Sequence, residues 1–199
     1  MSVACPHRLI LASASPRRRE LLASLGLQFS VVTAAVQEHE AEDADPRALV
    51  RHNATIKADG VARLHPDAMV LGADTTVCVD GIVLNKPSDL ADARRMLRCL
   101  SGRAHSVFTC LALRCLAVGL GEDHIVESRV FFRVLDEAAI DRYLSRANPL
   151  DKAGGYGIQE HGELIVDRWE GSWTNIMGLP MEETKAVLTR LKVLPSTGC

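Results

Sequence analysis

Aromatic residues are scarce in this sequence, and charge of neither sign predominates. Aromatic side chains make up 4% of the 199 residues, and 23 lysines and arginines face 25 aspartates and glutamates, which gives a formal net charge of -2. A platform for single-stranded nucleic acid needs stacking aromatics, and binding to a duplex needs a positive field. The composition therefore disfavours both kinds of nucleic-acid-binding protein. The hydrophobic share of 47% indicates an ordinary globular chain.

Long apolar runs and paired cysteines are missing as well. No segment approaches the roughly 18 apolar residues of a membrane span, and the run at 9–12 is too short for a secretory signal. No two cysteines have the C-x-x-C spacing of zinc or thioredoxin-type sites. The cysteines are Cys5, Cys78, Cys99, Cys110, Cys115 and Cys199. We expect reduced, structural thiols in a cytoplasmic protein that does not enter a membrane.

Common motifs of nucleotide binding and hydrolysis are also absent. The sequence contains neither the G-x-x-x-x-G-K-[ST] loop nor the G-x-G-x-x-G fingerprint, and neither H-E-x-x-H nor G-x-S-x-G. The seven histidines are scattered without ligand spacing. Any chemistry must therefore be sought among the charged residues.

Short apolar runs alternate with helical patterns, which is typical of an α/β protein. Strands are predicted at 9–11, 29–32, 69–79, 82–84, 105–118, 125–135 and 164–166. Helices are predicted at 16–25, 46–64, 88–100 with Ser88 as its cap, 136–146 and 181–194. Asp80-Gly81 predicts a tight hairpin. No repeat or linker interrupts the pattern, so a single domain over residues 1–199 is expected.

Charged residues occupy three positions where this pattern does not favour them. Arginines fill the first turn of the helix after Pro16, where the helix dipole disfavours cations. Lys57 lies on a helical stripe with Val50 and Ala54, and Asp74 interrupts a buried strand. Each has an ordinary alternative: a solvated helix start, a lysine that extends to solvent, and an aspartate that caps nearby amides. Each also fits a site for an anion, because guanidinium groups and helix amides bind phosphate.

Three further segments add weaker signals. Lys86 stands before a proline, and the glycine-rich loop 151–159 ends in Gln159, whose amide has a donor and an acceptor for a base edge. The acidic run 38–45 is typical of a solvated loop, although one member can hold Mg²⁺. Cations together with a few carboxylates are the groups needed to bind and cleave a phosphate chain with a metal ion.

Six segments together resemble the Maf family of nucleoside triphosphate pyrophosphatases. In family order they are LILASASPRR at 9–18, GADT at 72–75, KP at 86–87, LSGRAHSV at 100–107, DKAGGYGIQ at 151–159 and GLP at 178–180. The end of the fifth segment is similar to the branch that acts on dTTP and UTP, and differs from the branch that acts on 7-methyl-GTP. The resemblance implies an elongated mixed β-sheet with flanking helices, two lobes around a central cleft, and a relation to the inosine triphosphate pyrophosphatases.

The same resemblance implies roles for individual residues. Asp74 matches the proposed general base, and Glu38 matches an acid that holds the metal together with Asp74. The positions that match phosphate contacts are Ser13, Arg17, Arg18, Lys57 and Lys86, and those that match base selection are Arg17, Thr75 and Gln159. The implied cofactor is Mg²⁺, for which Mn²⁺ can substitute. A homodimer is plausible from the family.

The expected reaction is hydrolysis of dTTP and UTP to the monophosphate and pyrophosphate. Three departures from the family pattern concern its details: Asn85 before Lys86, Glu160-His161 after Gln159, and Gln37 beside Glu38. A house-cleaning pyrophosphatase for modified or purine nucleotides is one alternative. A non-catalytic regulator of cell division or a nucleic-acid-binding protein is another, which the clustering of the basic residues at a few points disfavours.

Overall fold

All strands of the described part of the chain belong to one mixed sheet. The computed structural model describes residues 8–194. The strands are β1 (Leu9–Leu11), β2 (Phe29–Val31), β3 (Met69–Val79), β4 (Ile82–Leu84), β5 (Ala104–Cys115), β6 (Leu120–Phe132) and β7 (Val166–Glu170). Their order is β2-β1-β3-β5-β6-β7, and β4 pairs with β3 beside this path. β1 runs parallel to β2 and β3, whereas the other pairs are antiparallel.

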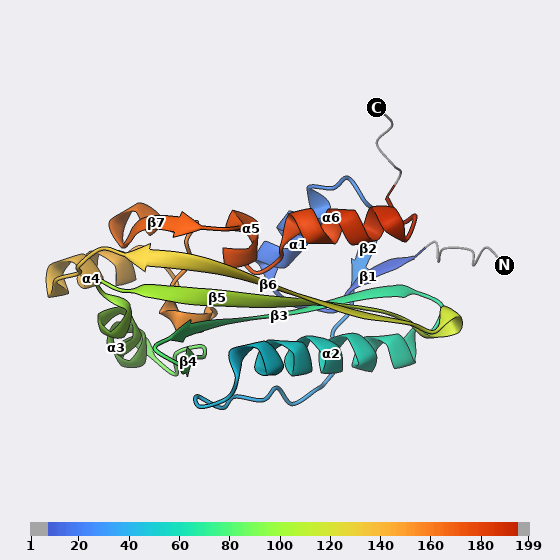
Figure 1. Ribbon diagram of the computed structural model, residues 1–199, viewed down its shortest axis with the longest axis horizontal. Coiled ribbons are helices and arrows are strands. Elements are labelled where there is room, and N and C mark those ends of the chain that lie inside the picture. The colour runs from blue at the N-terminus through green and yellow to red at the C-terminus, as the bar shows by residue number, and fades with distance from the viewer. Residues whose placement is uncertain (1–7, 195–199) are drawn as a thin grey trace.

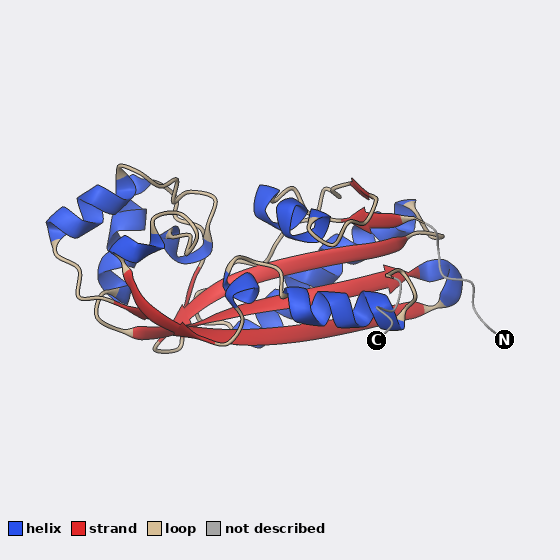
Figure 2. Cartoon of the chain, turned by 90° about the horizontal axis from the view of Figure 1, so that it is seen from above, coloured by secondary structure: helices blue, strands red, loops and turns tan. Residues whose placement is uncertain are grey.

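Helices cover both faces of this sheet and one of its ends. They are α1 (Pro16–Ala23), α2 (Pro46–Leu64), α3 (Leu90–Leu100), α4 (Glu137–Leu144), α5 (Trp173–Ile176) and α6 (Met181–Arg190). Figure 1 shows α2 on one side of the long strands β3, β5 and β6, with α1 and α6 on the other. Figure 2 shows α3 and α4 grouped at one end, so the molecule is elongated along these strands. Within residues 8–194, no helix is both long and apolar enough to cross a membrane.

Side chains of β3 point alternately to the two faces of the sheet and pack into two cores, one on each face. Met69, Leu71 and Ala73 pack with residues of α1 and α6, and Val70 packs with residues of α2. Successive side chains of a strand point to opposite faces, so both faces need apolar residues. This requirement explains the nearly continuous apolar run that begins the strand.

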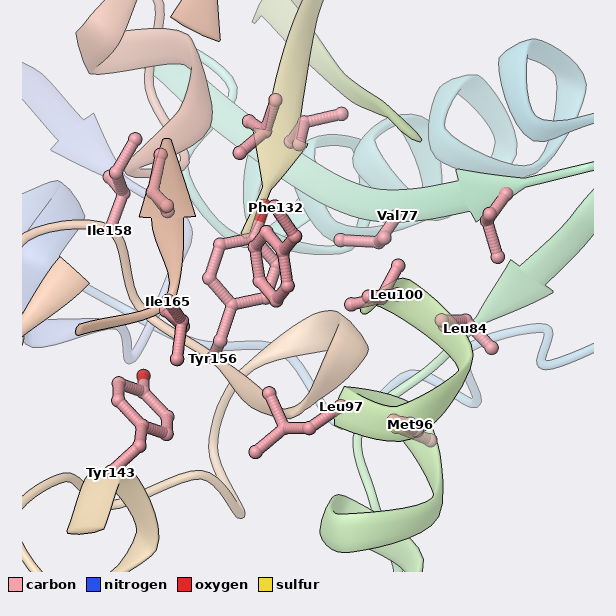
Figure 3. Close-up of a cluster of buried hydrophobic side chains, with 14 of the residues drawn as sticks. Val77, Leu84, Met96, Leu97, Leu100, Phe132, Tyr143, Tyr156, Ile158 and Ile165 are labelled. Carbon is pink, nitrogen blue, oxygen red and sulfur yellow. The ribbon is translucent and has the colours of Figure 1, made fainter. Parts of the chain in front are cut away.

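A third core fills the end of the molecule that carries α3 and α4. Leu97, Leu100, Phe132, Tyr143 and Tyr156 belong to it, and Figure 3 shows how their side chains gather between the strands and the helices. The third core therefore forms one lobe, and the two cores beside α1, α2 and α6 form the other. The long strands join the two lobes.

Gly72 sets the distance between α2 and β3. A Cβ atom at this position would lie 2.7 Å from the backbone oxygen of Ala54 and 2.9 Å from Cβ of Ala58. Only glycine allows two backbones to approach so closely. Gly72 and Asp74 share the face of β3 that α2 covers, so the close approach brings Lys57 of α2 within reach of Asp74.

Most of the predicted elements are present, and several boundaries are wrong. The helix at 46–64, the strands at 69–79 and 82–84 and the hairpin turn are confirmed. Asp89, not Ser88, caps α3, because its side chain accepts a hydrogen bond from the amide of Asp92 at 2.8 Å. The last helix ends at Arg190, and Lys192 beyond it has a positive φ of 58°.

Polar side chains along edge and hairpin strands account for the other differences. The strand predicted at 164–166 is β7, which starts at Val166 and carries four exposed residues, while Ile165 before it is fully buried. β6 begins at Leu120 because residues 120–124 pair with the end of β5. The four-residue helix α5 has no apolar periodicity and was not predicted. Free thiols occur at Cys78, Cys99, Cys110 and Cys115, whereas Cys5 and Cys199 lie outside the described residues.

Candidate active site

A cavity of about 400 Å³ lies between the two lobes, at an interrupted edge of β3. On this edge β3 pairs with β1 only as far as Leu71 and with β4 only from Val77. The stretch between them has no strand beside it and borders the cavity. All nine candidate residues line this space: Ser13, Arg17, Arg18, Glu38, Lys57, Asp74, Thr75, Lys86 and Gln159.

Lys57 binds two carboxylates inside the cavity. Its Nζ atom lies 2.7 Å from Oδ1 of Asp74 and 2.6 Å from Oε2 of Glu38, and its side chain is 14% exposed. Of the two interpretations that the sequence allowed, extension to solvent is therefore wrong for Lys57. The opposite occurs at Leu64, the last residue of α2, which is apolar and yet 66% exposed.

Asn53 fixes the segment that carries Glu38 against α2. Its side-chain oxygen accepts a hydrogen bond from the backbone amide of His39 at 2.8 Å, and its Nδ2 donates to the carbonyl of His39 at 3.0 Å. The same Nδ2 lies 3.4 Å from Oδ2 of Asp74. Asn53 is one helical turn before Lys57, so a single face of α2 holds both carboxylates.

Lys57 and its neighbours change the ionisation of Glu38. Burial tends to raise the pKa of Glu38, but the hydrogen bond and charge of Lys57, with the charge of Lys86, lower it overall. Glu38 is therefore ionised in the folded protein at neutral pH. The cavity keeps a carboxylate in the form that can bind a metal ion.

Arg18 is held by neutral oxygen atoms. Its Nε donates to the carbonyl of Gly178 at 2.7 Å, its Nη1 to Oγ of Ser13 at 3.2 Å and its Nη2 to Oγ1 of Thr75 at 2.9 Å. Among the ion pairs formed within residues 8–194, none includes Arg18. Burial lowers the pKa of this guanidinium and the charge of Asp74 raises it. Arginine nevertheless stays protonated, so Arg18 presents an uncompensated positive charge to the cavity.

Gly178 provides the backbone conformation and the space that these hydrogen bonds of Arg18 require. Its φ of +110° is strained for any other residue, and a Cβ atom there would lie 3.4 Å from Oγ1 of Thr75 and 3.6 Å from Nε of Arg18. Ser15 caps the start of α1 and accepts from the amide of Arg18. The side chain of Arg18 therefore extends from the first turn of α1 in a fixed orientation.

Arg17 connects α1 to the other lobe. Its Nη1 lies 2.8 Å from Oδ2 of Asp151, and its Nη2 donates to the carbonyl of Asp151 at 3.2 Å. The other oxygen of Asp151 lies 2.7 Å from Nζ of Lys152, which is 4% exposed and also binds Glu160 at 2.9 Å. The first helical turn and the glycine-rich loop therefore meet across the cavity.

Buried hydroxyl groups position the glycine-rich loop that carries Gln159. The hydroxyl of Tyr143 accepts from the amide of Gly157 at 2.9 Å, and the hydroxyl of Tyr156 lies 2.6 Å from Nε2 of His105. Burial lowers the pKa of His105 to about 3, so this contact involves a neutral imidazole. Nε2 of Gln159 lies 3.5 Å from Oε1 of Glu160, one of the residues that depart from the family pattern.

Glu38 and Asp74 are the two residues that would hold a divalent cation in this cavity. Both bind the same Lys57 nitrogen, through Oε2 of Glu38 and Oδ1 of Asp74, so the two carboxylates lie side by side in the cavity wall. Across residues 8–194, no group of three or more histidine, cysteine, aspartate or glutamate side chains forms a ready-made metal cage. Mg²⁺ commonly takes one or two carboxylates and completes its shell with water and substrate phosphates. The residues present fit that mode of binding.

Sequence reasoning missed several residues that build this site. Asn53 had a signal, because it is polar, lies four positions before Lys57 and occupies a face that should be apolar. Asp151 belongs to a quoted motif, but its partner Arg17 is 134 positions away. Thr109 lies in an apolar strand and has no distinguishing signal in the sequence.

The chain is similar in sequence to known proteins over most of its length. The model of the family described as Maf-like protein matches residues 8–191. A dTTP/UTP pyrophosphatase of Akkermansia muciniphila is 44% identical over 184 residues, covering 92% of this chain and 96% of that protein. One from Bordetella bronchiseptica is 48% identical over 192 residues, covering 92% of each. Among solved structures, the Ham1 protein of Staphylococcus aureus has a TM-score of 0.46 and 14% identity, covering 65% of this chain and 72% of that chain.

Proposed function

We propose that this chain, which belongs to the Maf family, hydrolyses dTTP and UTP to the nucleoside monophosphate and pyrophosphate. The observation that carries the proposal is the pairing of two features in one cavity. Asp74 is held in place by Lys57, and Arg18 keeps a positive charge that no carboxylate contact neutralises. Such a cavity offers a proton acceptor and an anion site side by side.

The choice of substrate rests on the relatives and on Gln159. Several relatives with 42% to 48% identity are named dTTP/UTP pyrophosphatase. Gln159 lines the cavity next to the glycine-rich loop, where its amide can hydrogen-bond the polar edge of a pyrimidine. Scarce aromatics favour edge contacts over stacking as the means of holding the base. We place the activity in the cytoplasm.

In the proposed mechanism Asp74 acts as the general base. Its Oδ1 is engaged by Lys57, whereas its Oδ2 has, in the described part of the chain, a single contact of 3.4 Å with Asn53 and can accept a proton from water. The water oxygen forms a bond to the α-phosphorus, and the bond from that phosphorus to the oxygen bridging to the β-phosphate breaks. Pyrophosphate leaves with the bridging oxygen.

The cations of the cavity stabilise the charge that develops on pyrophosphate. Arg18 and Lys86 both line the cavity and form no ion pair with a carboxylate among residues 8–194, and Lys86 is the more exposed of the two. Arg17 must share its guanidinium with Asp151. Preorganised donors of this kind lower the barrier without the cost of reorienting solvent.

We further propose that Glu38 and Asp74 hold Mg²⁺, for which Mn²⁺ can substitute. When bound, the ion supplies charge neutralisation on the phosphates and lowers the pKa of a coordinated water. Lys57 keeps the two carboxylates close together against their mutual repulsion. Gln37, which departs from the family pattern beside Glu38, is not among the residues that line this cavity.

A screen of nucleotides tests the proposal. The purified chain is incubated with Mg²⁺ and each of dTTP, UTP, dCTP, ITP and 7-methyl-GTP, and pyrophosphate is converted to phosphate by an added pyrophosphatase. We expect the highest kcat/KM for dTTP and UTP, monophosphate as the nucleotide product, and loss of turnover with a chelator. Higher values for ITP or 7-methyl-GTP contradict the substrate assignment, and turnover of no nucleotide contradicts the function.

A further inference from the structure

Thr109 lies behind the cavity, directly opposite Thr75. The two threonines are cross-strand partners in the antiparallel pairing of β5 with β3, and their hydroxyl oxygens are 2.9 Å apart. Thr109 is fully buried and does not line the cavity, whereas Thr75 does. Any effect of Thr109 on a bound ligand is therefore indirect, and Thr75 is its hydrogen-bonded neighbour in the cavity wall.

The direction of each hydrogen bond follows from the supply of protons. A hydroxyl group has one proton, and a carbonyl oxygen can only accept. Oγ1 of Thr109 lies 3.1 Å from the carbonyl oxygen of Asn175, so its proton is donated there. Thr109 then accepts from Thr75, and Thr75 in turn accepts from Nη2 of Arg18 at 2.9 Å.

The alternative acceptor for the Thr75 proton is already occupied. The carbonyl of Gly178 is 3.5 Å from Oγ1 of Thr75, and it accepts from Nε of Arg18 at 2.7 Å. If Thr75 turned its proton toward Gly178, it would compete with the guanidinium for that oxygen. Thr109 prevents this competition by taking the Thr75 proton itself.

The hydrogen bonds from Asn175 through Thr109 and Thr75 to Arg18 form a relay, and its Asn175 end is fixed to the sheet. Asn175 is fully buried, and its Nδ2 donates to the carbonyl of Val107 at 3.1 Å and to Oγ of Ser128 at 3.0 Å. These contacts fix α5 on β5 and β6, and Gly178 follows α5 two residues later. The chain of directed bonds therefore starts at a rigid point and ends at Arg18.

We propose that Thr109 is a positioning residue that orients Arg18 toward the phosphates of the substrate, through the hydroxyl of Thr75. The inference rests on the proposed function for the identity of the ligand. Preorganisation is the physical reason: Arg18 can stabilise charge only if its free N–H groups point into the cavity before the phosphates arrive. A misdirected guanidinium loses binding and transition-state stabilisation together.

Thr76 provides a matched control. It is the next residue of β3, is 2% exposed, and its hydroxyl is a buried group without a hydrogen-bond partner. Thr76 faces the opposite side of the sheet from Thr75 and is not among the residues that line the cavity. Thr76→Val therefore makes the same chemical change beside the relay without touching it.

The experiment measures kcat and KM for dTTP in Thr109→Val, Thr109→Ser and Thr76→Val. Valine keeps the shape of threonine, so the fold is retained and melting temperatures report any general damage. We expect kcat/KM to fall about tenfold in Thr109→Val and to return to within about twofold of wild type in Thr109→Ser. Thr76→Val should stay within about twofold of wild type, since it removes an unpartnered hydroxyl.

A double-mutant cycle separates positioning from a structural effect. Lysine at position 18 cannot reach Thr75 and Gly178 at once, so in Arg18→Lys the substitution Thr109→Val should change kcat/KM by less than about twofold. An equal loss in both backgrounds overturns the inference, as does a single variant Thr109→Val with wild-type kcat/KM.

A binding measurement keeps the inference independent of turnover. The probe is dTTP with a methylene group between the α- and β-phosphorus, titrated calorimetrically in the presence of Mg²⁺. Binding about tenfold weaker in Thr109→Val than in wild type supports a positioning role for Thr109. This conclusion holds even if the wild-type chain cleaves no nucleotide, a result that would overturn only the proposed function. If the wild-type chain does not bind the probe at all, both proposals are overturned.

Discussion

Two cations meet in the cavity from opposite faces of β3, and they are held in different ways. Lys57 comes from α2 and binds the carboxylates of Asp74 and Glu38. Arg18 comes from α1, and within residues 8–194 its side chain binds a carbonyl and two hydroxyl oxygens. One cation is neutralised by its partners, whereas the other is held by groups that leave its charge intact.

The difference separates two tasks that one bound triphosphate requires. A buried cation between two acids organises those acids and has little charge left for a ligand. A cation held by neutral oxygens costs more to bury but attracts an anion strongly. The Lys57 side of the cavity thus suits the proton acceptor and the metal, and the Arg18 side suits the leaving phosphates.

Removing the charge of Asp74 should give the largest loss of activity, because it removes a carboxylate bound by Lys57. Asp74→Asn keeps the shape of the side chain but removes the proton acceptor and one of the two carboxylates for a metal. We expect kcat for dTTP to fall by on the order of 1000-fold. The melting temperature should fall as well, because Asp74 forms a partly buried ion pair with Lys57. Pyrophosphate release at saturating Mg²⁺ measures the loss.

Asp59→Asn is the matched control for that variant. Asp59 also pairs with a cation, Arg114, at 2.7 Å, but it lies outside the cavity between the lobes. Its activity should stay within about threefold of wild type while stability decreases, because loss of a partly buried ion pair acts on folding. Comparable activity losses in the two variants would show that the Asp74 effect is structural.

Arg18→Gln, which breaks the other side, should give the second largest effect. Glutamine retains hydrogen-bonding capacity but removes the charge, so we expect kcat/KM for dTTP to fall about 100-fold. The relative effect should decrease at high salt, because screening weakens the wild-type attraction for the anion. Arg19→Gln is the control on the same helical turn, since Arg19 is exposed and does not line the cavity. Equal kinetics for Arg18→Gln and Arg19→Gln would contradict the comparison.

The fold was predictable where local patterns carried it. The apolar stripe of α2 and the apolar runs at the two ends of β3 record burial directly, so both elements have the predicted bounds. β7 was misplaced because an edge strand with exposed side chains leaves no apolar run. α5 was missed because buried hydrogen bonds of Asn175 hold it, and such bonds are invisible before the partner strands are known.

The candidate site was predictable for residues that violate their local pattern. Lys57 and Asp74 stand where apolar residues belong, and the structure pairs them across 17 positions. Thr109 violates nothing, since threonine is a good strand residue. Its relation to Arg18 depends on the register of β3 with β5 and on the turn after α5, neither of which the sequence states.

The smallest expected effect is a change in melting temperature that depends on the ionisation of Glu38, the second carboxylate bound by Lys57. Lys57 makes the pKa of Glu38 in the folded protein lower than in the unfolded chain, where its ordinary value is 4.5. The unfolded state therefore binds more protons between these two values, so the stabilisation is complete above about pH 4.5 and is lost as the pH falls through the folded pKa. Glu38→Gln removes this contribution. We expect the variant to melt about 1 to 3 °C below wild type at pH 7.

The gap between Glu38→Gln and wild type should close as the pH is lowered through the range below 4.5, because protonated glutamate and glutamine bind Lys57 with similar strength. Melting temperatures measured by circular dichroism from pH 7 to pH 3 follow the gap. Glu40→Gln is the control, since Glu40 is exposed in the same acidic run and takes part in no ion pair among residues 8–194; its melting temperature should follow wild type at every pH. A Glu38→Gln gap that stays constant down to pH 3 would mean that the charge of Glu38 does not contribute to stability, and Lys57 would then have one charged partner of consequence, Asp74, instead of two.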